Sequence, residues 1–128
     1  MRHRRFIGLG SMLVVLLLAA VVGAGLLPAG AAGATVKRVG IRNMAFAPQT
    51  ITVKTGTKVT WKNADGVVHN VTSASSMQTT ASVTGLFASA SLSNGQKFSF
   101  TFKKKGTFYY VCTIHASMAS MHGKVIVK

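Results

Sequence analysis

Residues 35–128 constrain the fold more than any other part of the sequence, because they form a series of short strand-like segments. Each segment is rich in Val, Ile, Thr, Phe or Tyr, and Gly, Pro, Asn or Asp separates it from the next. No amphipathic helical period is sustained over three turns. The pattern therefore predicts one all-β domain, either a β-sandwich or a small barrel. The predicted strands are residues 36–41, 50–54, 57–62, 69–73, 96–102, 107–112 and 124–127.

Secondary structure is easy to assign in one stretch of this region and difficult in another. Phe98, Phe100 and Phe102 alternate with polar residues, which indicates a strand with one buried side and one side facing solvent. Residues 75–93 are rich in Ser, Thr and Ala, and no element can be assigned to them clearly. The seven predicted strands therefore leave one long connection uninterpreted.

The N-terminal residues 1–34 predict an export signal. Three Arg lie within the first five residues, the stretch 9–22 is apolar apart from Gly10 and Ser11, and residues 32–34 form a small-residue cleavage motif. Cleavage there would start the mature chain near Thr35. We therefore expect a periplasmic or extracellular protein with a single domain over residues 35–128.

Retention of the signal as an anchor is the alternative. Residues 6–27 contain no charged side chain, and this stretch is long enough to cross a hydrocarbon layer of about 30 Å. An uncleaved segment would hold the protein at a membrane. The sequence favours cleavage, because the small-residue motif is well formed and directly precedes a strand-like stretch.

The composition excludes several classes of chemistry. Asp65 is the single acidic residue, so glycosidase and aspartic protease mechanisms, which need two acids, are excluded, as are calcium loops. Asp65 precedes a Gly and is interpreted as a turn residue. Cys112 is the single Cys, which excludes an internal disulfide, a four-Cys zinc site and an iron–sulfur cluster.

One loop near the C-terminus concentrates soft metal ligands. Cys112 is followed by His115, Met118 and Met121 at intervals of three residues. A thiolate, imidazoles and a weak axial thioether suit copper, and His69 is the candidate for the second imidazole. His122, in the same loop, is expected to be an exposed residue. A cysteine hydrolase built on Cys112 is disfavoured because no oxyanion donors are evident, so we expect no enzyme.

Six blocks that occur in the same order as in a known family extend this interpretation. Together they resemble the plastocyanin and amicyanin branch of the cupredoxins, the blue copper proteins. The resemblance implies a Greek-key β-sandwich, one copper ion and one-electron transfer. It implies His69, Cys112 and His115 as ligands, and Asn70 as the residue whose amide ties the two ligand loops together. The blocks are residues 43–48, 51–56, 59–63, 69–71, 106–115 and 121–125.

The axial Met has two candidates, because residues 116–118 and 119–121 form a tandem triplet. Met118 has the short amicyanin-like spacing from His115, whereas Met121 has the Met-x-Gly-x-Val context of the family. We favour Met121, because the strand that begins at Lys124 fixes that end of the loop and extra residues are absorbed most easily before it.

The charge of the domain bears on its partners. Residues 35–128 carry twelve Lys and Arg against Asp65, a net charge of +11. The run 103–105 raises the possibility of nucleic-acid binding, but export argues against it. Six residues of strand at about 3.3 Å each place that run roughly 20 Å from Cys112, at the opposite pole. The charge should instead steer a monomeric carrier to acidic redox partners or hold it near an anionic surface.

A copper chaperone or store is the second functional hypothesis. Met118, Met121 and His122 are crowded beside Cys112, and Cu(I) binds well to such soft groups. The electron carrier remains the favoured hypothesis, because the six blocks belong together in that family. The electron donor, the acceptor and the reduction potential are not encoded in any recognisable motif.

Overall fold

The computed structural model describes residues 33–128, so the predicted signal, apart from its last two residues, lies outside the described residues. Within the described part, nine strands and two short 3₁₀ helices follow one another, and no helix there is long and apolar enough to cross a membrane. The strands are β1 (Val36–Arg42), β2 (Ala45–Ala47), β3 (Thr50–Val53), β4 (Thr57–Asn63), β5 (Thr72–Ala74), β6 (Val83–Ala88), β7 (Lys97–Phe102), β8 (Gly106–Val111) and β9 (His122–Val127).

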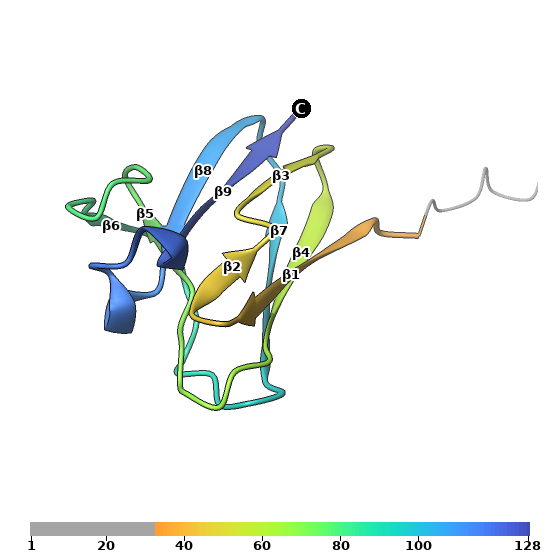
Figure 1. Cartoon of the computed structure of the whole chain (residues 1–128). Helices are drawn as coiled ribbons and strands as arrows, with labels where there is room; N and C mark the ends of the chain where they lie inside the picture. Colours follow the sequence, from red (N-terminus) through yellow and green to blue (C-terminus); the bar gives the residue numbers. More distant parts are fainter. Residues whose placement is uncertain (1–32) are drawn as a thin grey trace, which may run out of the picture. The chain divides into compact units, whose positions relative to one another are not determined.

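The strands form two mixed sheets, which makes the domain the predicted all-β Greek-key sandwich (Figure 1). One sheet has the order β2-β1-β4-β7 and the other the order β3-β9-β8-β5-β6. β1 runs parallel to β4, and β3 runs parallel to β9, while the other pairs are antiparallel. Consecutive strands β7 and β8 lie in different sheets, so the exposed Lys103–Lys105 turn crosses from one sheet to the other.

The core forms because alternate side chains of each strand point inward. In β4, Val59 and Trp61 are fully buried, and their register places them opposite Phe100 and Phe98 of β7. The Trp61 ring packs edge-on against Tyr110 of β8 in the other sheet, with 5.2 Å between ring centroids. Large aromatic side chains at these positions join the two sheets and stabilise the frame that carries the loops.

The sequence predicted most strands within two residues of their ends, but three details were wrong or missing. His69 does not begin a strand: β5 starts at Thr72, and His69 lies before it in an isolated bridge with Leu92. β2 was not predicted, and neither was β6, which occupies part of the uninterpreted stretch 75–93. β6 is an edge strand exposed at every residue except Phe87, so its sequence carries no alternating pattern.

Candidate metal centre

The loop between β8 and β9 is folded by successive tight turns. It contains the 3₁₀ helices η1 (Thr113–His115) and η2 (Ala119–Met121). The backbone N–H of His115 donates to the Cys112 carbonyl, and that of Met118 to the His115 carbonyl, at 3.2 and 3.0 Å. The Cys112 N–H donates to the Met121 carbonyl at 2.9 Å, which closes the loop. Residues 112 and 121 are therefore held side by side at the base of the loop.

A second loop brings His69 to the same place. Buried Asn63, the last residue of β4, donates from Nδ2 to the carbonyls of Val67 at 2.8 Å and Leu92 at 2.7 Å. The backbone groups of His69 and Leu92 are hydrogen-bonded to each other in both directions. Asn63 thus shapes the loop by joining the carbonyls of Val67 and Leu92, which lie on either side of His69 in the sequence, through one buried side chain. This role of Asn63 was not predicted from the sequence.

The structure brings together His69, Cys112 and His115. His69 is distant from the other two in the sequence, whereas Cys112 and His115 are separated by one turn. Cys112 Sγ lies 3.8 Å from His69 Nδ1 and 3.5 Å from His115 Nδ1. The potential ligand atoms of the three side chains all lie within 4.8 Å of one another. His69 and Cys112 are fully buried, whereas His115 is half-buried, so the cluster reaches the surface through His115.

The outer nitrogen of His69 has a partner of its own. His69 Nε2 donates to Asp65 Oδ2 at 2.9 Å, which leaves Nδ1 as the nitrogen with a free lone pair. Because Nδ1 is the nitrogen that faces Cys112, the hydrogen bond selects the tautomer that can bind a metal inside the cluster. A carboxylate in this position also fixes the orientation of the ring.

Asp65 also has a structural role beyond that of the turn residue predicted from the sequence. Its carboxylate accepts hydrogen bonds from the N–H of Asn43 at 2.6 Å and of Met44 at 3.0 Å. Asn43 and Met44 both adopt positive φ, at 53° and 55°, in the turn between β1 and β2. Burial raises the pKa of Asp65, but the hydrogen bonds from Met44, His69 and Asn43 outweigh it and leave this pKa below its usual value of 3.8.

Asn70 connects the two ligand loops. Its side chain donates from Nδ2 to Thr113 Oγ1 at 2.7 Å and accepts at Oδ1 from the Thr113 N–H at 2.9 Å. Its backbone N–H points at Cys112 Sγ, 3.4 Å away. Asn70 therefore contacts both the sulfur of Cys112 and the residue that follows it.

The two candidate axial residues differ in their surroundings. Met121 is fully buried, and its carbonyl accepts the Cys112 N–H. Met118 is 38% exposed, on the outer side of the loop. Two hydrogen bonds to other parts of the chain hold the Met121 end: Ser120 Oγ donates to the Met44 carbonyl at 2.7 Å, and Gln49 Nε2 donates to the Ala119 carbonyl at 2.7 Å.

The prediction that His122 is an exposed loop residue is wrong. His122 is the first residue of β9 and is only 1% exposed. Its Nε2 donates to the Ala116 carbonyl at 2.7 Å, which fixes the far side of the ligand loop. This backbone partner satisfies Nε2 of the buried ring, whereas Nδ1 has no hydrogen-bond partner among the described residues.

The donor set fits one copper ion. One thiol and two imidazole nitrogens converge from two loops, and buried Met121, whose backbone is bonded to that of Cys112, is the candidate thioether; such a donor set favours copper over zinc. The surrounding hydrogen bonds hold the ligands in place without a metal, because the Asn70–Thr113 bonds join the two ligand loops and the Asp65 bond fixes the ring of His69. Such an arrangement can bind copper with little rearrangement of the protein.

Comparison with known proteins identifies the family. Residues 34–128 match the family of copper binding proteins described as plastocyanin/azurin. The match covers most of the chain, and the chain therefore belongs to this family. It is a cupredoxin of the plastocyanin and amicyanin type, and copper is its cofactor.

Characterised relatives agree with this assignment. The chain is 35% identical over 97 residues to amicyanin-alpha of Methylorubrum extorquens, a match that covers 76% of this chain and 74% of the relative. It is 35% identical over 90 residues to amicyanin of Paracoccus denitrificans, covering 70% of this chain and 63% of that protein.

Solved structures show the same architecture. A novel purple cupredoxin from Nitrosopumilus maritimus is 28% identical and matches with a TM-score of 0.63, covering 71% of this chain and 98% of that one. The oxidised state of an amicyanin mutant is 34% identical and matches with a TM-score of 0.58, covering 75% and 83% of the two chains.

Proposed function

We propose that this chain is an exported mononuclear blue-copper protein that carries single electrons between redox partners, and that it is not an enzyme. The observation that carries the proposal is the convergence of Cys112 Sγ with the Nδ1 atoms of His69 and His115, in two loops that hydrogen bonds hold together. The similarity to amicyanins and plastocyanins supports it. Residues 1–34 supply the export signal.

In this proposal, His69, Cys112 and His115 bind one copper ion, and Met121 is the axial ligand. Copper supplies the Cu(I)/Cu(II) couple. The protein holds the ligands in one arrangement for both states, because Asn70 ties the two loops and Asp65 fixes the ring of His69. Little then has to move when an electron is gained or lost, and fast transfer follows from that rigidity.

Electrons would enter and leave through His115. This side chain is half-buried, and exposed apolar residues belong to the two ligand loops. We call these residues the apolar rim, and exposed apolar residues on the ligand loops allow close approach of a redox partner without desolvation of charges. The apolar rim consists of Val67, Val68, Ile114 and Met118.

The positive charge of the domain would attract a redox partner at longer range than contacts with the apolar rim. Twelve Lys and Arg against one Asp steer the protein toward partners with acidic surfaces, and steering changes the association rate more than the affinity. We therefore expect the rate of electron transfer to an acidic partner to fall as salt rises, because charges are screened beyond about 10 Å at 0.1 M ionic strength.

The colour of the copper-loaded protein tests this proposal. A thiolate ligand gives Cu(II) an intense charge-transfer band, so we expect a strongly coloured oxidised protein. Cys112→Ser should abolish the band while the fold still forms. His122→Asn is the matched control, because His122 donates to a carbonyl and is not assigned as a ligand. A spectrum that survives Cys112→Ser would contradict the proposal.

A copper chaperone or store is the second candidate function, favoured by Met118 and Met121 beside Cys112. That function predicts a colourless Cu(II) form, preferential binding of Cu(I) and slow redox cycling. His122 contributes less to it than the sequence suggested, because its Nε2 is engaged by the Ala116 carbonyl. Stopped-flow oxidation and reduction of the copper-loaded protein separates the two functions.

A further inference from the structure

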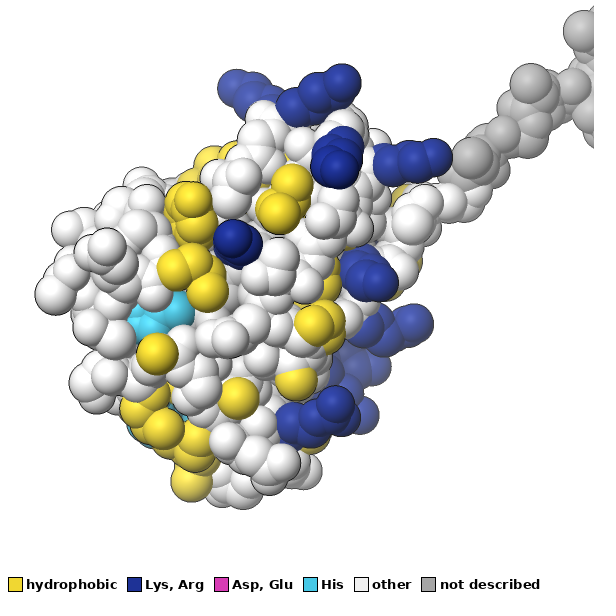
Figure 2. Space-filling model, turned by 45° about the horizontal axis from the view of Figure 1, so that its top comes forward, with side chains coloured by type: hydrophobic (Ala, Val, Ile, Leu, Met, Phe, Trp, Pro, Cys, Tyr) yellow, Lys and Arg dark blue, Asp and Glu magenta, His cyan; other side chains and the backbone are white. Residues whose placement is uncertain are grey.

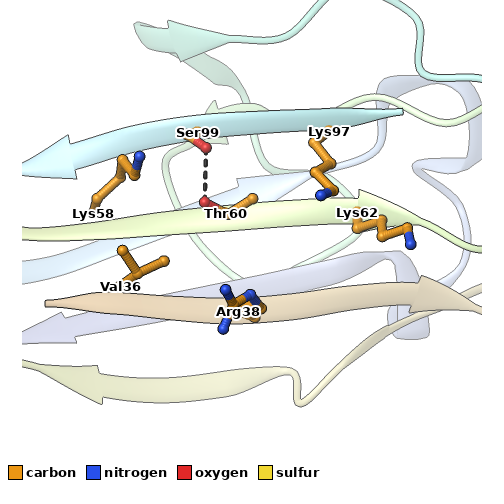
Figure 3. Close-up of a pocket in the computed structure, with 7 residues that line it drawn as sticks. All are labelled: Val36, Arg38, Lys58, Thr60, Lys62, Lys97 and Ser99. Carbon is orange, nitrogen blue, oxygen red and sulfur yellow. Dashed lines mark hydrogen bonds between the residues drawn. The ribbon is translucent and has the colours of Figure 1, made fainter. Parts of the chain in front are cut away.

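A groove on the outer face of the β1-β4-β7 sheet gathers positive charge (Figure 3). Four cationic side chains line it, and Thr60 and Ser99 share a hydrogen bond of 2.7 Å at its centre. Val36, the first residue of β1, completes the lining. We call this surface the basic sheet face; its cations are Arg38, Lys58, Lys62 and Lys97.

The arrangement of these cations opposes folding. Lys62 and Lys97 are directly opposite each other in the antiparallel β4–β7 pair, and like charges at such positions are destabilising. Asp65 is the one acidic side chain among residues 33–128, and its carboxylate is engaged by His69, so no acidic side chain neutralises the basic sheet face. The cations of this face repel one another, and no acidic side chain of the chain compensates for that repulsion. This arrangement points to an anionic partner outside the chain.

The charge is also one-sided. The strands of the β1-β4-β7 sheet hold six Lys and Arg, whereas the strands of the other sheet hold only Lys124. In the space-filling view, Lys and Arg side chains gather on the side of the molecule away from the visible His side chains, which lie among hydrophobic ones (Figure 2). The basic sheet face and the apolar rim have no residue in common.

The extent of the face favours a broad surface over a small anion. Lys58 and Lys62 are four residues apart on one strand, a separation of about 13 Å at roughly 3.3 Å per residue. Arg38 on β1 and Lys97 on β7 add width on either side of β4. A single phosphate cannot bridge these positions, whereas a plane of many headgroups can contact all of them together.

We propose that the basic sheet face docks on the surface of an anionic phospholipid bilayer. Each Lys or Arg close to such a surface is attracted to it, and the attraction decays within a Debye length. Two observations favour lipid over an acidic protein. A redox partner would use the apolar rim, and the length and width of the basic sheet face, over three strands, suit a plane of many headgroups. Docked in this way, the carrier keeps the apolar rim free for partners beside the membrane.

Lysine footprinting of the full chain tests the proposal. The protein is reconstituted on vesicles of phosphatidylcholine alone and on vesicles with 30% phosphatidylglycerol, so that any insertion of residues 6–27 is common to both. Acetylation rates are then measured by mass spectrometry. We expect Lys58, Lys62 and Lys97 to react about tenfold more slowly on the anionic vesicles, with the protection lost in 0.5 M salt. Lys54 and Lys104 should react equally on both.

A pair of matched variants gives a second readout, the reaction of Arg38 with phenylglyoxal. Anionic vesicles should protect Arg38 in the wild type and in a control variant with residues 103–105 changed to Gln. Protection should be lost when Lys58, Lys62 and Lys97 are changed to Gln, which removes the same charge. Equal rates on both vesicles would overturn the proposal. Protection by soluble polyglutamate without protection by vesicles would also overturn it, in favour of an acidic protein partner.

Discussion

Asp65, the single acidic residue of the chain, accepts a hydrogen bond of 2.9 Å from Nε2 of His69. The same carboxylate accepts the N–H groups of Asn43 and Met44 in the β1–β2 turn. The Met44 carbonyl in turn accepts the hydroxyl of Ser120, next to the proposed axial residue. One carboxylate therefore links the ring of a proposed ligand, a turn with two positive φ values and the far end of the ligand loop.

Asp65→Asn should raise the reduction potential of the copper centre. The negative charge beside His69 stabilises Cu(II) more than Cu(I), and an amide has only one acceptor oxygen for three donors. We expect the colour to remain, the potential to rise and the Cu(II) affinity to fall about tenfold. Cyclic voltammetry and competition with a chelator measure these changes.

Thr101→Lys is the matched control for this prediction. Thr101 is exposed on β7, so the change alters the net charge by the same one unit without contact with His69. The control should leave potential and affinity nearly unchanged. An equal rise in both variants would show that net charge, and not the hydrogen bond to His69, sets the potential.

Asp65 also predicts a pH dependence of the stability of the fold. The pKa of Asp65 is lower in the folded protein than its ordinary value of 3.8, so its ionised form stabilises the fold. That stabilisation is fully present above about pH 4 and is lost as pH falls through the folded pKa. Urea unfolding of copper-free wild type and Asp65→Asn, at pH 7, 5 and 3, should show a difference that shrinks only at the lowest pH. A difference that stays constant would mean that Asp65 does not titrate with folding.

The sequence predicted what depends on local pattern and residue type. Alternation identified β7, and the Cys-x-x-His spacing with nearby Met residues identified the ligand loop. The sequence could not predict the roles of residues that depend on tertiary contacts. Asp65 lies in a turn and gains its role only because the β1–β2 turn packs against it, and His122 is buried only because the Ala116 carbonyl lies within reach.

Gly123→Ala should destabilise the domain strongly. Gly123 pairs with Tyr110 in the β8–β9 register, and a Cβ at this position would overlap the Tyr110 ring. The ring has no space to retreat, because it is fully buried against Trp61, and burial raises the pKa of its hydroxyl to about 12. We expect a loss of about 2 kcal/mol in the free energy of unfolding, measured by urea denaturation.

Two comparisons test the physical cause of that loss. Gly66→Ala, at a position where an added Cβ meets no atom within 4 Å, should cost little. In a Tyr110→Val background, where the ring is gone, Gly123→Ala should cost much less than in the wild type. If Gly123→Ala costs the same in both backgrounds, backbone freedom and not overlap with Tyr110 explains why this position needs glycine.

The axial position can be assigned by two parallel substitutions. Met121 is fully buried, and its backbone is bonded to that of Cys112, whereas Met118 is 38% exposed on the apolar rim. A weak axial thioether tunes the potential more than it holds the metal. Met121→Leu, which keeps volume and apolarity, should therefore keep the colour and raise the reduction potential, while Met118→Leu should leave both nearly unchanged. The reverse pattern would assign the ligand to Met118, and an unchanged potential in both variants would mean that neither thioether occupies the axial position.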